Sequence, residues 1–114
     1  MEISEKKLDG VSVVAVKGRI DSVNAPKLTA HLRALMSVGD ARLVVDLDEV
    51  VYISSAGFRT LLITAKLATD HRGKLAICHL SAELRRLFEI AALLDFFKLY
   101  PDQAEAIAAL NELA

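Results

Sequence analysis

Disulfides, phosphate-binding loops and membrane spans are all missing from this sequence. Its one cysteine, Cys78, excludes an internal disulfide, which is typical of proteins of the reducing cytosol. Its five glycines form no phosphate-cradling loop, and no apolar run approaches the roughly 20 residues that span a bilayer. The net charge of -1 comes without a basic stripe, which argues against a nucleic-acid-binding surface. We therefore expect a cytoplasmic protein with no nucleic-acid partner and no direct membrane insertion.

Side chains for catalysis or metal binding are also scarce. The three histidines are scattered along the chain at His31, His71 and His79. Cys78 and His79 are adjacent in an expected strand, so their side chains should point to opposite faces and not share an ion. A hydrolytic triad could be drawn from Ser55, His79 and Asp46, but the G-x-S-x-G elbow is absent. We expect no metal, no cofactor and no enzymatic activity.

Strand-like apolar runs alternate with segments of helical periodicity, and this alternation predicts the fold class. Strands are expected over residues 3–8, 11–16, 41–47, 74–80 and 97–100. Helices are expected from a cap at Ser22 or Asn24 to Gly39, from after Ile53 to Gly73, after Ser81, and after Pro101 with Ile107, Leu110 and Leu113 on the apolar face. The order ββαβαβαβα indicates an α/β domain over residues 1–114, with a mixed, mainly parallel sheet and about four helices.

The segment from Val50 to Arg59 has the strongest functional signal, because it leads from a buried strand directly into a helix. Partners and ligands of open α/β sheets usually bind at that end of a strand. Ser54 and Ser55 are placed at the start of the helix, and Ala56 and Gly57 are small enough to let a partner approach the backbone. The alternative is that one serine only caps the helix and the other is a turn residue.

Two stretches carry a resemblance to a known family. Residues 52–62, YISSAGFRTLL, resemble the signature of the anti-sigma factor antagonists, which are STAS domain proteins, and residues 16–21, VKGRID, resemble the family's second landmark. The resemblance implies the STAS fold and phosphorylation of Ser55, the serine two positions before the motif glycine, with Ser54 as the minor candidate. It also implies a serine kinase that doubles as the anti-sigma factor. By the same resemblance, the unphosphorylated form should bind this factor and free a sigma factor, and a metal-dependent serine phosphatase should reverse the modification.

The resemblance also implies a partner-binding surface around the phosphorylated serine. Its expected members are Asp21, Ser22, Ser54, Ala56, Gly57, Arg59, Thr60 and Ile63. Asp21 should lie near Ser55 in a loop of residues 18–21 and act on phosphorylation, unless it only forms an Asx-type turn. Thr60 and Ile63 flank the apolar stripe of their helix, where ordinary packing or exposure is the alternative to partner contact. A rival function is a small STAS subunit of a membrane lipid-transport complex, which would bind the transporter ATPase without a phosphoserine.

Overall fold

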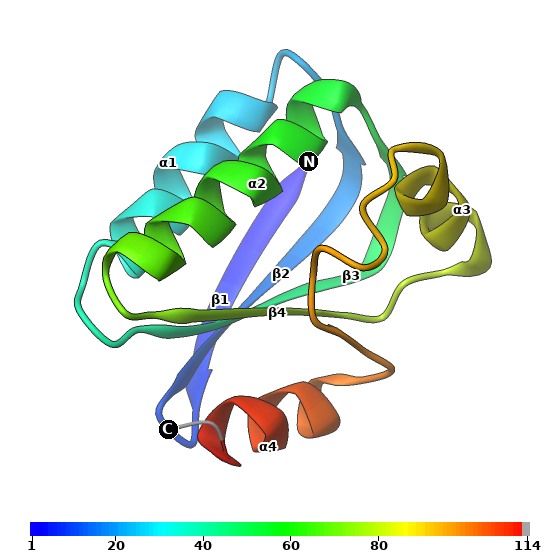
Figure 1. Ribbon diagram of the computed structural model, residues 1–114. Coiled ribbons are helices and arrows are strands. Elements are labelled where there is room, and N and C mark those ends of the chain that lie inside the picture. Colours follow the sequence, from blue (N-terminus) through cyan, green and yellow to red (C-terminus); the bar gives the residue numbers. More distant parts are fainter. Residues whose placement is uncertain (113–114) are drawn as a thin grey trace.

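A five-stranded mixed sheet forms the centre of the protein, whose computed structural model describes residues 1–112 (Figure 1). The elements are β1 (Glu2–Leu8), β2 (Val11–Ile20), α1 (Ala25–Met36), β3 (Arg42–Ile53), α2 (Ser55–Asp70), β4 (Lys74–Cys78), α3 (Ala82–Ile90), β5 (Leu99–Tyr100) and α4 (Gln103–Glu112). This confirms the expected order ββαβαβαβα. Leu113, expected on the last helix, lies outside the described residues.

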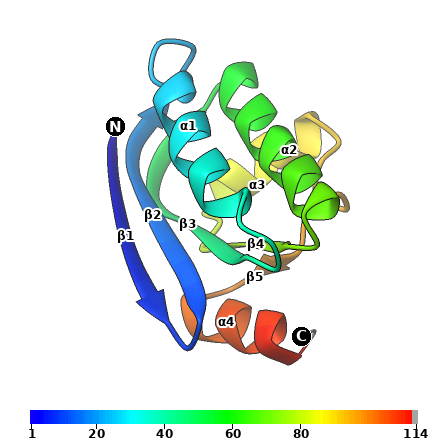
Figure 2. The same ribbon diagram turned by 90° about the vertical axis from the view of Figure 1, so that its left-hand side faces the viewer.

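The strands lie in the sheet in their order along the chain, β1-β2-β3-β4-β5. β1 pairs with β2 antiparallel, and the other pairs are parallel. Because each right-handed crossover advances the chain by one strand in the same direction, α1, α2 and α3 fall on one face of the sheet. α4 follows the edge strand β5 and covers the opposite face, as Figure 2 shows.

The alternation of side chains along the strands divides the apolar residues between two cores. On β2, Val14 and Val16 face the main core under α1, α2 and α3. Val11 and Val13, on the other face of the same strand, pack with Ile107 of α4 in a smaller core. Both faces of the sheet are therefore covered, which explains why the central strands read as continuous apolar runs and not as an alternating pattern.

Two strands are longer than expected, and this corrects the loop predicted at residues 18–21. β2 continues through Gly18 and Arg19 to Ile20, paired with β3 up to Ile53. The pairing shifts register between Gly18 and Arg19, and Gly18 has a φ of +99°, which a residue with a side chain rarely adopts. The bulge at this glycine lets the strand bend and keep its pairing, so only Asp21 onward forms a loop.

Candidate functional site

Ser54 joins the end of β3 to the start of α2. Its backbone N–H donates to the carbonyl of Ile20 at 2.9 Å, which brings the ends of β2 and β3 together. Its own carbonyl accepts from Phe58 N–H at 3.0 Å, and its Oγ accepts from Gly57 N–H at 3.4 Å. Ser54 is therefore the N-cap of α2, and it is half-buried. The expectation that one of the two serines caps this helix is confirmed.

Ser55 differs from its neighbour because it is the first residue of α2 and is exposed. The backbone N–H groups of the first turn of a helix have no acceptor within the helix, and the helix dipole adds positive potential there. No acidic residue lies in the first turn of α2 to neutralise that potential. The Ser55 hydroxyl is thus accessible to a partner and sits where the protein tolerates an anion.

Asp21 forms a compact turn between β2 and α1. Its Oδ1 accepts from the N–H groups of Val23 and Asn24, both at 3.0 Å. In return, Oδ1 of Asn24 accepts from Asp21 N–H at 2.9 Å. Asn24 stands at the N-cap position of α1 without capping it by its side chain. The Asx-type turn that the sequence left as an alternative is therefore present, next to the Ile20 carbonyl that binds Ser54.

A groove of about 490 Å³ runs between α1 and α2. Five of the residues expected to bind a partner line it: Ser22, Ala56, Arg59, Thr60 and Ile63. The other wall comes from α1, and its residues were not identified from the sequence: Ala25, Pro26, Thr29, Ala30 and Arg33. A hydrogen bond between the hydroxyls of Thr29 and Thr60, whose oxygens are 2.8 Å apart, joins the two helices across the groove. Thr60 lies at the bottom of the groove and is only 1% exposed. The small side chains of α1 follow helical spacing, which is the signal that could have identified them.

Gly57, which we expected among the partner-binding residues, does not line the groove. It is buried, and a Cβ at this position would lie 2.7 Å from Cγ2 of Ile53 and 2.8 Å from Cγ2 of Ile20. Both isoleucines end the strands that carry the site. The absence of a side chain at Gly57 therefore lets α2 pack closely on the ends of β2 and β3. This packing sets the position of Ser54 and Ser55 at the start of the helix.

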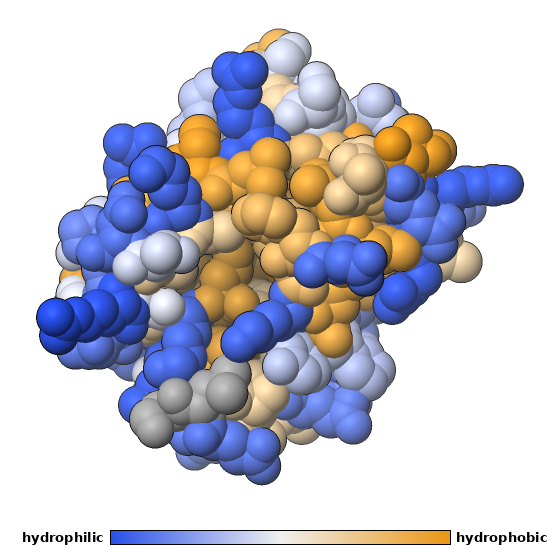
Figure 3. Space-filling model, viewed as in Figure 1, coloured by the Kyte–Doolittle hydropathy of each residue, from blue (hydrophilic) through white to orange (hydrophobic). Residues whose placement is uncertain are grey.

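An apolar hollow of about 190 Å³ lies on the same face of the sheet as the groove, between α2 and the segment before β5 (Figure 3). Its lining includes Ala65, Ala68, Phe96 and Phe97, and Phe96 is 59% exposed. These α2 residues belong to the C-terminal half of the helix. The hollow is therefore separate from the N-terminal turn of α2, which carries the two serines.

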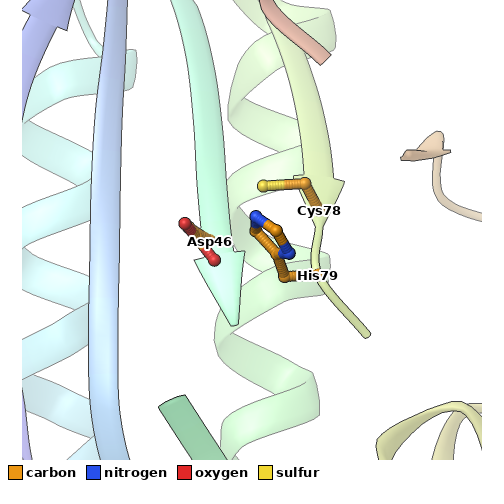
Figure 4. Close-up of side chains that lie close together, drawn as sticks. All are labelled: Asp46, Cys78 and His79. Carbon is orange, nitrogen blue, oxygen red and sulfur yellow. The ribbon is translucent and has the colours of Figure 1, made fainter. Parts of the chain in front are cut away.

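Asp46, Cys78 and His79 come together on the opposite face of the sheet, so the expectation that Cys78 and His79 point apart is wrong (Figure 4). His79 has a φ of +61°, which ends β4 and turns the imidazole back to the side of Cys78. Burial, reinforced by the carboxylates of Asp46, Asp102 and Asp48, raises the pKa of Cys78 from 9.0 to about 12. The thiol is protonated at neutral pH, which excludes it as a nucleophile in the protein as it stands. Ser55 is not among the residues of this cluster.

Comparisons with known proteins place the chain in a family. The model of the STAS domain matches residues 2–106, and no helix within residues 1–112 is long and apolar enough to cross a membrane. The protein named "Putative anti-sigma factor antagonist BtrV" from Bordetella bronchiseptica is 37% identical over 111 residues, covering 97% of this chain and 96% of its own. The anti-sigma-B factor antagonist of Listeria monocytogenes is 32% identical, covering 87% and 86% of the two chains.

A solved structure agrees with these sequence matches. The crystal structure of an anti-sigma factor antagonist from Mycobacterium paratuberculosis superimposes with a TM-score of 0.84 at 31% identity. The superposition covers 96% of this chain and 93% of the other. The chain therefore belongs to the STAS domain family and is a relative of its anti-sigma factor antagonists.

Proposed function

We propose that this protein is an anti-sigma factor antagonist whose binding is switched by phosphorylation of Ser55. In this proposal, residues 1–114 act in the cytoplasm as one STAS domain with no catalytic activity. The unphosphorylated form sequesters an anti-sigma factor that is also a serine kinase, and so releases a sigma factor or another output. A metal-dependent serine phosphatase restores the binding form. The observation that carries the proposal is an exposed serine on the first residue of α2, beside the groove between α1 and α2.

The local geometry favours Ser55 over Ser54 as the phosphate acceptor. Oγ of Ser54 accepts a hydrogen bond from Gly57 N–H, and the side chain is half-buried. Phosphorylation of Ser54 would disrupt this cap, which is worth about 0.5–2 kcal/mol. A phosphate on Ser55 would instead project into solvent from the positive end of the helix. The modification at Ser55 therefore changes the surface and leaves the fold intact.

The effect on binding follows from charge. A phosphate adds about -1.5 to -2 charges, and a partner that covers Ser55 must desolvate them or oppose them. Ser55 and Arg59 are also four residues apart on α2, an arrangement that favours an acidic group N-terminal to a basic one. A phosphate on Ser55 would thus draw the Arg59 guanidinium away from the groove that it lines. Every 1.4 kcal/mol lost in this way weakens the complex about tenfold.

The test begins with capture of partners from the native cytosol on wild-type protein and on Ser55→Asp. The captured kinase is then incubated with wild type, Ser55→Ala and the control Ser4→Ala, which alters an exposed serine of β1. We expect mass spectrometry to find phosphate on Ser55 in wild type and the control, and none in Ser55→Ala. Calorimetric titration should show tight binding by Ser55→Ala, weaker binding by Ser55→Asp, and the weakest binding by phosphorylated wild type.

Two results would contradict the proposal. Phosphate found only on Ser54 would move the switch by one residue. Equal affinity of phosphorylated and unphosphorylated protein would remove the switch altogether. If the captured partner were then a transporter ATPase, the role of a lipid-transport subunit would replace that of an antagonist.

A further inference from the structure

The register of the sheet places two potential metal ligands side by side on the face covered by α4. Asp46 of β3 and Cys78 of β4 are direct neighbours across a parallel pair, so both side chains leave the sheet on the same face. His79 joins them because its left-handed backbone reverses the expected alternation. One ligand atom from each residue lies within 4.8 Å of the other two (Figure 4). A carboxylate, a thiol and an imidazole therefore lie close together on this face of the sheet.

The surroundings hold this cluster in place. Oδ1 of Asp46 accepts from Asp48 N–H at 2.9 Å, and Oδ2 accepts from Nε2 of Gln103 at the start of α4. A carboxylate has about four acceptor positions, so both oxygens keep a lone pair for an ion. Nδ1 of His79 lies 3.9 Å from Oδ1 of Asp48, which adds a second carboxylate beside the cluster. The two hydrogen bonds to Asp46 are of the kind that forms the usual outer shell of a metal site.

Solvent reaches the cluster through a cleft. This cleft has a volume of about 760 Å³, and its lining includes Asp46, Asp48, His79 and Gln103. Cys78 is fully buried behind them. An ion arriving from solvent would therefore meet the carboxylate and the imidazole first and the sulfur last.

We propose that Asp46, Cys78 and His79 form a binding site for one Zn²⁺ ion or a similar divalent transition metal. Thiolate and imidazole ligands select such metals over Mg²⁺ and Ca²⁺, which prefer oxygen. The fourth position of the tetrahedral site falls to water. Zinc bonds of about 2.0–2.3 Å place tetrahedral ligand atoms roughly 3.5 Å from one another. The three ligand atoms now lie within 4.8 Å of one another, so side-chain rotations that move them by about 1 Å complete the site. On binding, the metal–sulfur bond replaces the S–H bond, and the thiol proton passes to solvent.

The test uses untagged full-length protein, freed of metal by a chelator and titrated with Co²⁺ and then with Zn²⁺. Because Cys78 is the one cysteine of the chain, a sulfur-to-cobalt charge-transfer band identifies it directly as a ligand. We expect one equivalent of Co²⁺ to produce this band and one equivalent of Zn²⁺ to abolish it, while excess Mg²⁺ leaves it unchanged. His79→Gln should weaken binding by at least about tenfold, since even the loss of an outer-shell partner costs that much.

Two variants make the test specific. Cys78→Ser should lose the charge-transfer band while circular dichroism shows a folded protein. His71→Gln removes a histidine outside the cluster and should bind like wild type. A protein that gives no band with Co²⁺, or whose affinity is the same in wild type and His79→Gln, would overturn the proposal. If Cys78→Ser does not fold, the proposal is still decided by two measurements. These are the charge-transfer band of wild type with Co²⁺ and the lower metal affinity of His79→Gln.

Discussion

At the scale of single residues, the two serines at the start of α2 have separable roles. Ser54 caps the helix and Ser55 is exposed, so their replacement by alanine should affect different properties. We expect Ser54→Ala to lower the free energy of unfolding by about 0.5–2 kcal/mol, because the cap is lost. Ser55→Ala should change it by less than about 0.5 kcal/mol. Urea unfolding of both variants measures this difference, and equal destabilisation would contradict the assignment of Ser54 as the cap.

Asp21 combines a structural task with the role expected of it in phosphorylation. Asp21→Ala removes the acceptor of two backbone N–H groups and should cost about 0.5–1.5 kcal/mol, because solvent can reach these exposed and part-buried donors. This exceeds the near-zero cost expected of an ordinary surface change. Asp21→Asn keeps the Oδ1 acceptor and removes only the charge, so we expect near-normal stability with slower phosphorylation of Ser55. If Asp21→Asn is phosphorylated at the normal rate, the role of Asp21 is confined to forming the turn, and its charge does not act on phosphorylation.

The buried thiol predicts a pH dependence of stability. The pKa of Cys78 is raised to about 12 in the folded protein, against an ordinary value of 9.0. Between these values the unfolded chain loses this proton and the folded chain keeps it, so stability falls as pH rises from about 9 to about 12. The slope from this group approaches about 1.4 kcal/mol per pH unit. Denaturant unfolding of metal-free wild type and Cys78→Ala across this range should show the steeper decline in wild type, and parallel curves would contradict it.

At the scale of secondary-structure elements, the entry of the chain into α2 depends on close packing at Gly57. A methyl group there would stand 2.7 Å from Ile53 and 2.8 Å from Ile20, so α2 must shift away from the strand ends. We expect Gly57→Ala to cost about 1–3 kcal/mol and also to weaken partner binding, because Ser55 moves with the helix. Gly39→Ala is the matched control, since its Cβ would meet no atom closer than 4.0 Å. A stable Gly57→Ala variant with normal binding would show that the helix does not need this contact.

At the scale of the whole molecule, the sheet separates two surfaces. The groove between α1 and α2 lies on one face, and α4 with its small core lies on the other. Ile107→Val in that small core should therefore cost about 0.5–1.5 kcal/mol of stability. Partner binding by the folded protein should be unchanged, because no groove residue is touched. Calorimetric titration well below the unfolding temperature checks this, and a large change in affinity would reveal coupling through the sheet.

Much of the architecture could be predicted from local patterns. The alternation of apolar runs and helical periods predicts the element order, because each element buries one face at its own period. Ser81 was expected to cap a helix, and its Oγ does accept from Leu84 N–H at 3.1 Å. The motif containing Ser54 and Ser55 also marks the start of α2, where a strand leads directly into a helix. These features depend on residues that are close together in the chain.

Features that combine distant segments could not be predicted from local patterns. The extension of β2 to Ile20 depends on pairing with β3, and the inward position of Gly57 depends on where both strands end. The groove joins two helices that meet through Thr29 and Thr60. Local periodicity and capping are properties of neighbouring residues, so they are enough to predict which elements form. The tertiary structure decided which of their side chains meet, because strand register and helix packing are set by contacts between residues far apart in the chain.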